Sequence, residues 1–339
     1  METSEIQILG IIYNSNIKCA IEISWTHILD KIKKQIRIYS QRYLTLFQRV
    51  IVINIVILAK VWYTAHTYPL PLKYSKLINK EIFHFLWQSK YNPIKREVLY
   101  QKKHEGGLGI LCVFYKAQSI FASTFLKQFL NSKEDNSLIK YYCALRMNPI
   151  FNILQLPKNV SFVKSKFYDE YVNLIRRLTS VNNFPNVSSA NIYSVLLPDC
   201  QPTVNSNHSI TWERAWKNMN FKYVNVNERD IIFKFLHNIL TTKNRLFQIK
   251  KINSPLCPLC NSIENQIHLF VECKKVKNVL LYFKDLLNKI CSIKNHNIIN
   301  ILHLNFKANK RQCNTAILLT TAYMGCIWYN RSQTKCIEI

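Results

Sequence analysis

The sequence of 339 residues predicts a mainly α-helical fold, and three observations support this prediction. Apolar residues recur at i, i+3 and i+4 along most of the chain, which is the pattern of an amphipathic helix. A single short apolar run, Ile6–Tyr13, resembles a β-strand followed by a turn. Only 5 residues are glycine and no glycine-rich phosphate-binding motif is present, which argues against the α/β nucleotide-binding folds.

The first third of the chain is expected to contain three helices separated by proline and glycine. Isoleucines at Ile28, Ile32 and Ile36 share one helical face. Three glycines in four residues require a turn, since no regular element tolerates them. The predicted elements are a helix that begins after Ser24, a second from Leu46 through Thr64, a third that ends near Trp87, and a turn at Gly106–Gly109.

The remaining two thirds alternate between helical and irregular patterns. Helical spacing extends from Val113 to about residue 145, and a proline-containing, polar stretch from about 150 to 210 is typical of a connector. Helical spacing returns at Trp212–Trp216 and Asp230–Leu240. A cysteine-rich segment at 257–273 follows, and helices are expected from there to the C-terminus.

The chain is strongly basic. Lys plus Arg number 46 and Asp plus Glu 19, which gives a formal net charge of +27, and residues 211–339 carry nearly half of this excess. Such a charge favours an anionic partner, with RNA or DNA first and an anionic membrane surface second. A codon bias toward lysine is the alternative explanation of the charge.

The acidic start of the chain, its short apolar runs and its cysteine count indicate an intracellular protein, in the nucleus or the cytoplasm. The chain opens with acidic residues, whereas a secretory signal opens with basic ones. The longest apolar run, Val50–Ala59, is about half of the ~20 residues that span a bilayer, so we expect no membrane partner. The 11 cysteines are an odd number without secretory context, which argues against a disulfide framework.

One motif carries recognisable chemistry. Cys257 and Cys260 form a C-x2-C pair, and His268 and Cys273 follow at the spacing C-x7-H-x4-C. Three thiolates and one imidazole suit tetrahedral Zn²⁺, and four protein ligands leave no open position, so the expected zinc is structural. The alternative is a buried thiol cluster beside a core histidine.

Basic residues lie on both sides of this motif. If zinc draws the two flanks together, their charges merge into one phosphate-binding surface. A solvated surface around a structural site is the alternative. The predicted nucleic-acid contacts in this region are Lys243, Arg245, Lys250, Lys251, Lys274, Lys275 and Lys277.

Catalytic residues are not evident. No two aspartates are adjacent, and no apolar strand carries the paired carboxylates of two-metal catalysis. The pair Asp169-Glu170 lies within a helical pattern and is expected to be solvated or capping. No G-x-S-x-G or H-E-x-x-H motif is present, and no pattern indicates a small-molecule substrate. We therefore expect that the chain is not an enzyme on its own.

Several segments, in order, resemble one family. The chain is similar to the C-terminal part of non-LTR (LINE-type) retrotransposon reverse transcriptases, which includes a reverse-transcriptase zinc-binding domain. The resemblance covers nearly the whole chain and is weakest at 145–210. The segments that carry it are Ile8–Ile11, Tyr43–Val50, Lys60–Tyr63, Phe85–Trp87, Ile94–Glu97, Glu105–Gly109, Leu240–Leu246 and Ile327–Arg331.

The resemblance implies a division of the chain: a helical thumb-like domain, a helical linker and a small CCHC zinc-binding domain. It implies a palm and primer-grip remnant at 1–24, the thumb-like domain at 25–115, the linker at 116–210, the zinc-binding domain at 211–300 and a C-terminal helix at 301–339. With the net charge, it also suggests phosphate contacts from the N-terminal third, at Lys31, Lys34, Arg37, Arg49 and Lys60.

The resemblance does not extend to polymerase activity. The family's palm carries a Y/F-x-D-D strand, and no position here matches its aspartates. The expected function is therefore RNA or DNA binding by a reverse-transcriptase fragment that lacks the polymerase site. Two alternatives stay open: a remnant that is non-functional or binds other proteins, and one part of a full RNA-directed DNA polymerase whose palm lies outside this chain.

Overall fold

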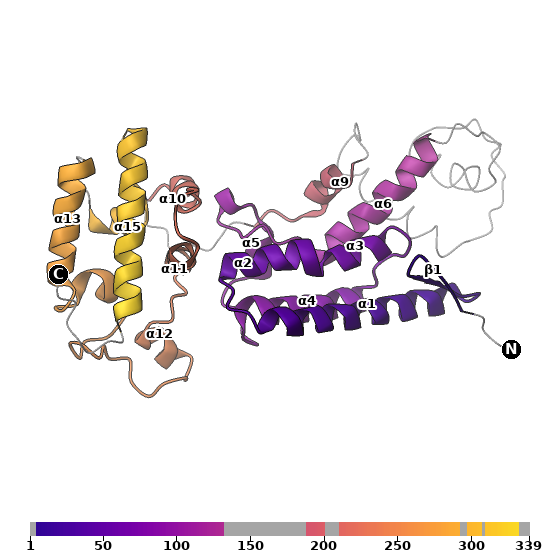
Figure 1. Cartoon of the computed structure of the whole chain (residues 1–339), viewed down its shortest axis with the longest axis horizontal. Helices are drawn as coiled ribbons and strands as arrows, with labels where there is room; N and C mark the ends of the chain where they lie inside the picture. The colour runs from indigo at the N-terminus through magenta and orange to yellow at the C-terminus, as the bar shows by residue number, and fades with distance from the viewer. Residues whose placement is uncertain (1–4, 132–187, 201–209, 292–296, 307–308, 332–339) are drawn as a thin grey trace. The chain divides into compact units, whose positions relative to one another are not determined.

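The structure is a computed structural model that describes residues 5–131, 188–200, 210–291, 297–306 and 309–331 (Figure 1). In this part of the chain most residues are helical, which confirms the predicted fold class. Contacts group the chain into two compact units. The first contains the described residues of Met1–Tyr43, Arg49–Tyr91 and Leu111–Asp199, and the second those of Leu44–Gln48, Asn92–Ile110 and Cys200–Ile339.

The five-segment division inferred from the sequence stays a prediction. Much of the expected linker, residues 132–187 and 201–209, lies outside the described residues, as do residues 1–4 and 332–339. The second unit draws on three separate stretches of sequence.

The N-terminal apolar run is a hairpin instead of the single strand that its composition suggests. Strand β1, Ile6–Ile8, pairs antiparallel with β2, Ile11–Tyr13, and Ile8 lies opposite Ile11. The two-residue loop between them has positive φ at Leu9 (49°) and at Gly10 (83°). Tight hairpin turns of the I′ type require this conformation at both central positions, and glycine adopts it without steric cost.

The first unit is built around α1, Ile17–Ser40, which packs along α4, Leu72–Trp87. Asn16 caps α1, because its side chain accepts a hydrogen bond from the backbone N–H of Lys18. Trp25 is fully buried on α1, and its indole Nε1 donates to the carbonyl of Pro69 at 2.9 Å. The buried face of α1 consists of Ala20, Ser24, Trp25, Ile28, Leu29 and Ile32.

The apolar helix expected from Leu46 through Thr64 is present as three successive elements. They are α2, Leu46–Ile51, the π-helical η1, Val52–Ile57, and α3, Ala59–Ala65. Among the described residues, the stretch Leu46–Ala65 is the one long and apolar enough to cross a membrane. This is weak evidence of a span, because a core helix passes the same test. The fully buried side chains of Ile53, Ile57, Leu58 and Val61 supply a reason for its composition.

The first unit is completed by α6, Val113–Asn131, which packs on α9, Ser189–Leu196. The rest of the helix expected to reach residue 145 lies outside the described residues. The hydroxyl of Tyr193 accepts a hydrogen bond from the backbone N–H of Cys112 at 2.9 Å. Burial raises the pKa of Tyr193 to about 12, so this hydroxyl stays neutral.

The glycine-rich segment forms the expected turn. It follows α5, Arg96–Tyr100, and the short η2, Lys103–Glu105, within the second unit. Gly106 and Gly109 have positive φ values of 87° and 67°. At Gly107 any Cβ would overlap with the carbonyl of Gln101, so this position requires glycine, and the positive φ values at Gly106 and Gly109 favour it.

The second unit packs around its last described helix, α15 (Lys310–Asn330), which contacts α11 (Val226–Leu236), α13 (Lys277–Cys291) and α14 (Ile298–Leu302). The ring of Tyr323 on α15 stacks on Phe283 of α13, with centroids 4.3 Å apart. Figure 1 shows α13 and α15 side by side. This unit also contains α10 (Trp212–Met219), α12 (Lys243–Gln248) and η3 (His268–Glu272).

Candidate metal centre

The C-x2-C pair lies in a tight hairpin within the second unit. Leu256 forms a β-bridge with Ile263, and the backbone N–H of Cys257 donates to the carbonyl of Ser262 at 2.7 Å. Asn261 turns the chain with φ at 58° and donates its N–H to the carbonyl of Cys257. Asparagine tolerates this left-handed conformation better than most residues. The hairpin therefore places the two thiols on one short loop.

The second pair of candidate ligands comes from the two ends of η3. His268 begins this π-helical turn, and the side chain of Asn265 accepts a hydrogen bond from its N–H at 2.7 Å. The N–H of Cys273 donates to the carbonyl of His268 at 2.9 Å. The four-residue gap in the motif is thus spanned by one wide helical turn, which brings Cys273 next to the imidazole.

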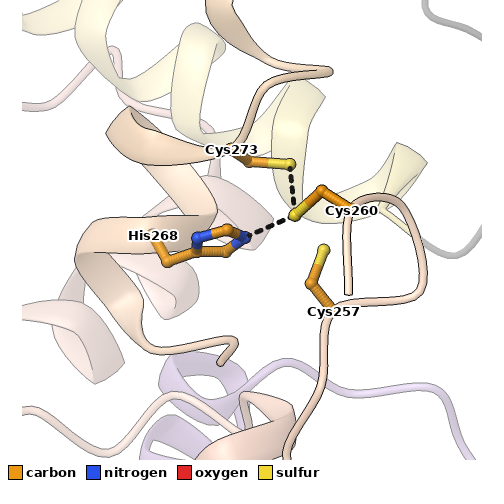
Figure 2. Close-up of side chains that lie close together, drawn as sticks. All are labelled: Cys257, Cys260, His268 and Cys273. Carbon is orange, nitrogen blue, oxygen red and sulfur yellow. Dashed lines mark hydrogen bonds between the residues drawn. The ribbon is translucent and has the colours of Figure 1, made fainter. Parts of the chain in front are cut away.

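The four side chains converge on one point (Figure 2). One ligand atom from each of Cys257, Cys260, His268 and Cys273 lies within 4.8 Å of all the others. Cys260 Sγ is 3.2 Å from His268 Nε2 and 3.8 Å from Cys273 Sγ. Zn–S bonds of about 2.3 Å arranged tetrahedrally separate two sulfurs by about 3.8 Å. The cluster can hold a metal ion, and its ligand types and spacing are compatible with zinc.

Burial and hydrogen bonds set the pKa values of the thiols in the cluster. Cys257, Cys273 and His268 are buried, and Cys260 is half-buried. Burial raises the pKa of Cys257 to about 12 and also raises that of Cys273. Burial acts to raise the pKa of Cys260, but hydrogen bonds with Ser262, Cys257 and Cys273 together lower it. Buried thiols stay protonated without a cation, and a divalent ion that neutralises several thiolates reverses this preference.

A buried carboxylate supports the hairpin. Glu264 is 2% exposed, and its Oε1 accepts a hydrogen bond from the backbone N–H of Lys243 at 2.8 Å. Its backbone carbonyl accepts from the N–H of Asn244, and its own N–H donates to Pro255. These bonds join the start of α12 to the hairpin that holds Cys257 and Cys260.

Helix α15 supports the other half of the centre. The hydroxyl of Tyr323 donates to the carbonyl of Phe270 at 2.6 Å, in the middle of η3. Phe270 is fully buried, and burial raises the pKa of the Tyr323 hydroxyl. The segment between His268 and Cys273 is therefore held by the core of the second unit.

The predicted nucleic-acid contacts around the motif all lie in the second unit. Lys243 and Arg245 are half-buried on α12, and Arg245 donates to the carbonyl of Asn238. The remaining five are exposed: Lys250, Lys251, Lys274, Lys275 and Lys277. Lys274 and Lys275 follow Cys273 directly, and α12 is bonded to the hairpin through Glu264, so both flanks border the same cluster.

The predicted contacts in the first unit are less uniform. Lys34 and Arg37 are exposed on α1, where Lys31 is half-buried. Lys60 is half-buried on α3. Arg49 donates from Nη1 to the carbonyl of Leu86 at 2.9 Å, near the end of α4, so its guanidinium has a structural contact.

Sequence reasoning missed the two residues that shape the centre from outside the ligand set. Glu264 is a buried carboxylate, and charge alone assigns such a residue to the surface. Asn265 has a recognisable signal, because it lies three residues before His268, where a capping side chain satisfies a free N–H at the start of a helical turn.

Comparison with known proteins adds no assignment. No family model matches the chain, and no curated protein is significantly similar to it in sequence. The functional conclusion therefore depends on the residues of the chain and their geometry.

Proposed function

We propose that the chain is an intracellular RNA- or DNA-binding protein whose nucleic-acid surface is organised by a structural zinc ion. The convergence of Cys257, Cys260, His268 and Cys273, with ligand atoms within 4.8 Å of one another, is the observation that carries the proposal. The resemblance to the C-terminal region of non-LTR reverse transcriptases supports it. In the nucleus or cytoplasm thiols remain reduced and available as ligands, and no described cysteine is part of a disulfide.

The surface around the centre has the charge that nucleic acid requires. The knot flank, which we define as Lys243, Arg245, Lys250, Lys251, Lys274, Lys275 and Lys277, carries seven cations on the two sides of one cluster. Phosphate neutralisation by lysine and arginine releases counterions, so binding weakens steeply as salt rises. The role of zinc in this proposal is to fix the two sides relative to each other, without a catalytic step.

The experiment measures the binding of the full chain, purified with zinc, to fluorescent single-stranded RNA and DNA by anisotropy at several salt concentrations. A variant with Lys251 and Lys274, one on each side of the motif, changed to Gln should weaken binding. The slope of log K against log salt should fall by about 0.7 for each lost phosphate contact. The matched control changes Lys284 and Lys289 to Gln; both are exposed on α13, away from the motif in sequence.

The outcomes separate the alternatives. Salt-dependent binding that the flank variant loses and the α13 variant retains supports the proposal. A folded, zinc-loaded chain that binds neither nucleic acid refutes it and favours a non-functional or protein-binding remnant. Equal loss in the two variants indicates non-specific attraction to net charge and also contradicts an organised surface.

A further inference from the structure

A cavity of the second unit lies outside the knot flank. It has a volume of about 870 Å³ and is lined by α10, by the loop that follows it and by the beginning of α15. Its cations come from all three segments: Arg214 and Lys217 on α10, Lys222 in the loop, and Lys310 as the first residue of α15. We call this cavity the α10–α15 groove.

The charge of the groove is strongly one-sided. Glu213 is the single carboxylate among its lining residues, against four cations. Among the described residues, none of these four cations belongs to an ion pair. Lys217, Lys222 and Lys310 are exposed and Arg214 is half-buried. Four like charges around one concave surface repel each other, and a polyanion in the groove relieves that repulsion.

Amide and aromatic groups accompany the cations. Asn218, Asn220, Asn314 and Phe221 line the same groove, and the amides of Asn218 and Asn220 donate to the carbonyls of Leu304 and Trp216. Tyr223 lies beside the groove, next to its lining residues Phe221 and Lys222: its ring makes an edge contact with Phe221, lies under the ammonium group of Lys222 at 4.5 Å and belongs to a residue that is 65% exposed. Cations interleaved with an exposed ring are the combination that binds both the phosphates and the bases of a single strand.

The groove is separate from the metal centre. Lys310 begins α15, whereas Tyr323 contacts η3 near the candidate ligands. At 1.5 Å per residue, these two positions are about 20 Å apart along the helix. A ligand in the groove therefore meets a different set of cations from a ligand at the knot flank.

We propose that the α10–α15 groove is a second nucleic-acid site, which holds the phosphodiester backbone of a single strand with Arg214, Lys217, Lys222 and Lys310 and stacks a base on Tyr223. This inference rests on the proposed function for the choice of nucleic acid as the anion. The cavity and the charges of the groove are independent of the zinc motif.

The experiment uses the zinc-loaded full chain and two readouts. The first is the salt-dependent affinity of a variant with Lys217, Lys222 and Lys310 changed to Gln, compared with the Lys284 and Lys289 control. The groove variant should bind a single-stranded oligonucleotide about tenfold more weakly at 100 mM salt, with a slope smaller by about 2. Y223A should weaken binding about tenfold and Y223F should restore it. Circular dichroism and zinc content show whether each variant is folded.

The second readout is protection of lysines from an amine-reactive label, read by mass spectrometry. Oligonucleotide should protect Lys217, Lys222 and Lys310, and inorganic phosphate at the same phosphate concentration should not. Equal protection by inorganic phosphate would assign the groove to a small anion and overturn the proposal. Protection by anionic vesicles without protection by oligonucleotide would assign it to a membrane surface and also overturn it.

The two proposals fail in distinguishable ways. Protection confined to the knot flank, with unchanged affinity of the groove variant, overturns the groove and leaves the proposed function. Protection confined to the groove overturns the knot flank and leaves this site. A chain that binds no oligonucleotide overturns both.

Discussion

The buried carboxylate of Glu264 lies 3.8 Å from the guanidinium of Arg331 and accepts a hydrogen bond from the backbone N–H of Lys243. Arg331 follows α15, lies 3.9 Å over the ring of Trp328 and donates to the carbonyl of Thr241. One carboxylate thus connects the hairpin of the metal centre to α12 and to the end of the last helix.

Removal of this carboxylate should destabilise the second unit. Glu264→Ala leaves the N–H of Lys243 without its acceptor and Arg331 without its counter-charge. A loss of about 2–3 kcal/mol in the free energy of unfolding is expected, because Arg331 is still partly exposed. Urea denaturation measures it. Asp285→Ala removes an exposed carboxylate paired with Lys289 and should change stability by less than about 0.5 kcal/mol. Equal effects of the two changes would contradict the structural role of Glu264.

Zinc should bind with one ion per chain and should stabilise the second unit. Cys260→Ser or His268→Ala is expected to abolish stoichiometric zinc, and a chelator should remove the cooperative unfolding transition of this unit. Cys326→Ser is the matched control, because Cys326 is an exposed cysteine on α15 outside the cluster. Elemental analysis and thermal melts measure both effects. Full zinc content in either ligand variant would refute this ligand set.

Acid should destabilise the second unit through His237. Burial lowers its pKa to about 4, although a hydrogen bond with the carbonyl of Gly106 opposes the shift. The unfolded chain takes up this proton near pH 6.5 and the folded chain near 4. Stability is therefore unaffected above pH 6.5 and falls by about 3 kcal/mol as the pH drops from 6.5 to 4.

The variant His237→Phe isolates this effect. It keeps an aromatic ring beside Trp216, whose ring stacks on His237 at 4.9 Å, and removes the titration. Its unfolding free energy should therefore depend less steeply on pH between 6.5 and 4. Protonation of metal ligands acts in both proteins and cancels in the comparison. Parallel pH profiles would contradict the assignment to His237.

The buried hydroxyl of Tyr323 should contribute more to the stability of the second unit than the hydroxyl of the exposed Tyr329. Tyr323→Phe preserves the stacking on Phe283 and removes the donor to the carbonyl of Phe270. A loss of about 1–2 kcal/mol in unfolding free energy is expected, because a buried carbonyl is left unsatisfied. Tyr329→Phe, at a ring that is 54% exposed, should be nearly neutral in the same denaturation experiment. A neutral Tyr323→Phe would show that η3 is held by other contacts.

The sequence predicts the parts of this protein that depend on local chemistry. The periodicity of Ile28, Ile32 and their neighbours predicts the part of α1 after Ser24, because one buried face requires that spacing; the helix itself begins earlier, at Ile17. The four candidate ligands follow from residue type and spacing, and the structure brings them together as expected. The turn at Gly106–Gly109 follows from the steric demands of glycine-only conformations.

Local sequence patterns do not predict contacts between segments that are far apart in the chain. The carboxylate of Asp230 accepts hydrogen bonds from the N–H groups of Leu46 and Phe47, and no local pattern joins positions so far apart. The α10–α15 groove combines Lys217 with Lys310 for the same reason. The apolar composition of Ile6–Tyr13 predicts one strand, and the turn at Leu9 and Gly10 divides it into two.

The three-part origin of the second unit has a consequence for biosynthesis. Its first segment, Leu44–Gln48, leaves the ribosome long before Asp230, which satisfies its backbone. At about 5–20 residues per second, that segment waits on the order of ten seconds or more for its partner. During this interval the ring of Phe47 also lacks Phe233, which it meets edge-on at 5.8 Å in the folded unit, so the nascent chain carries an apolar ring without this partner.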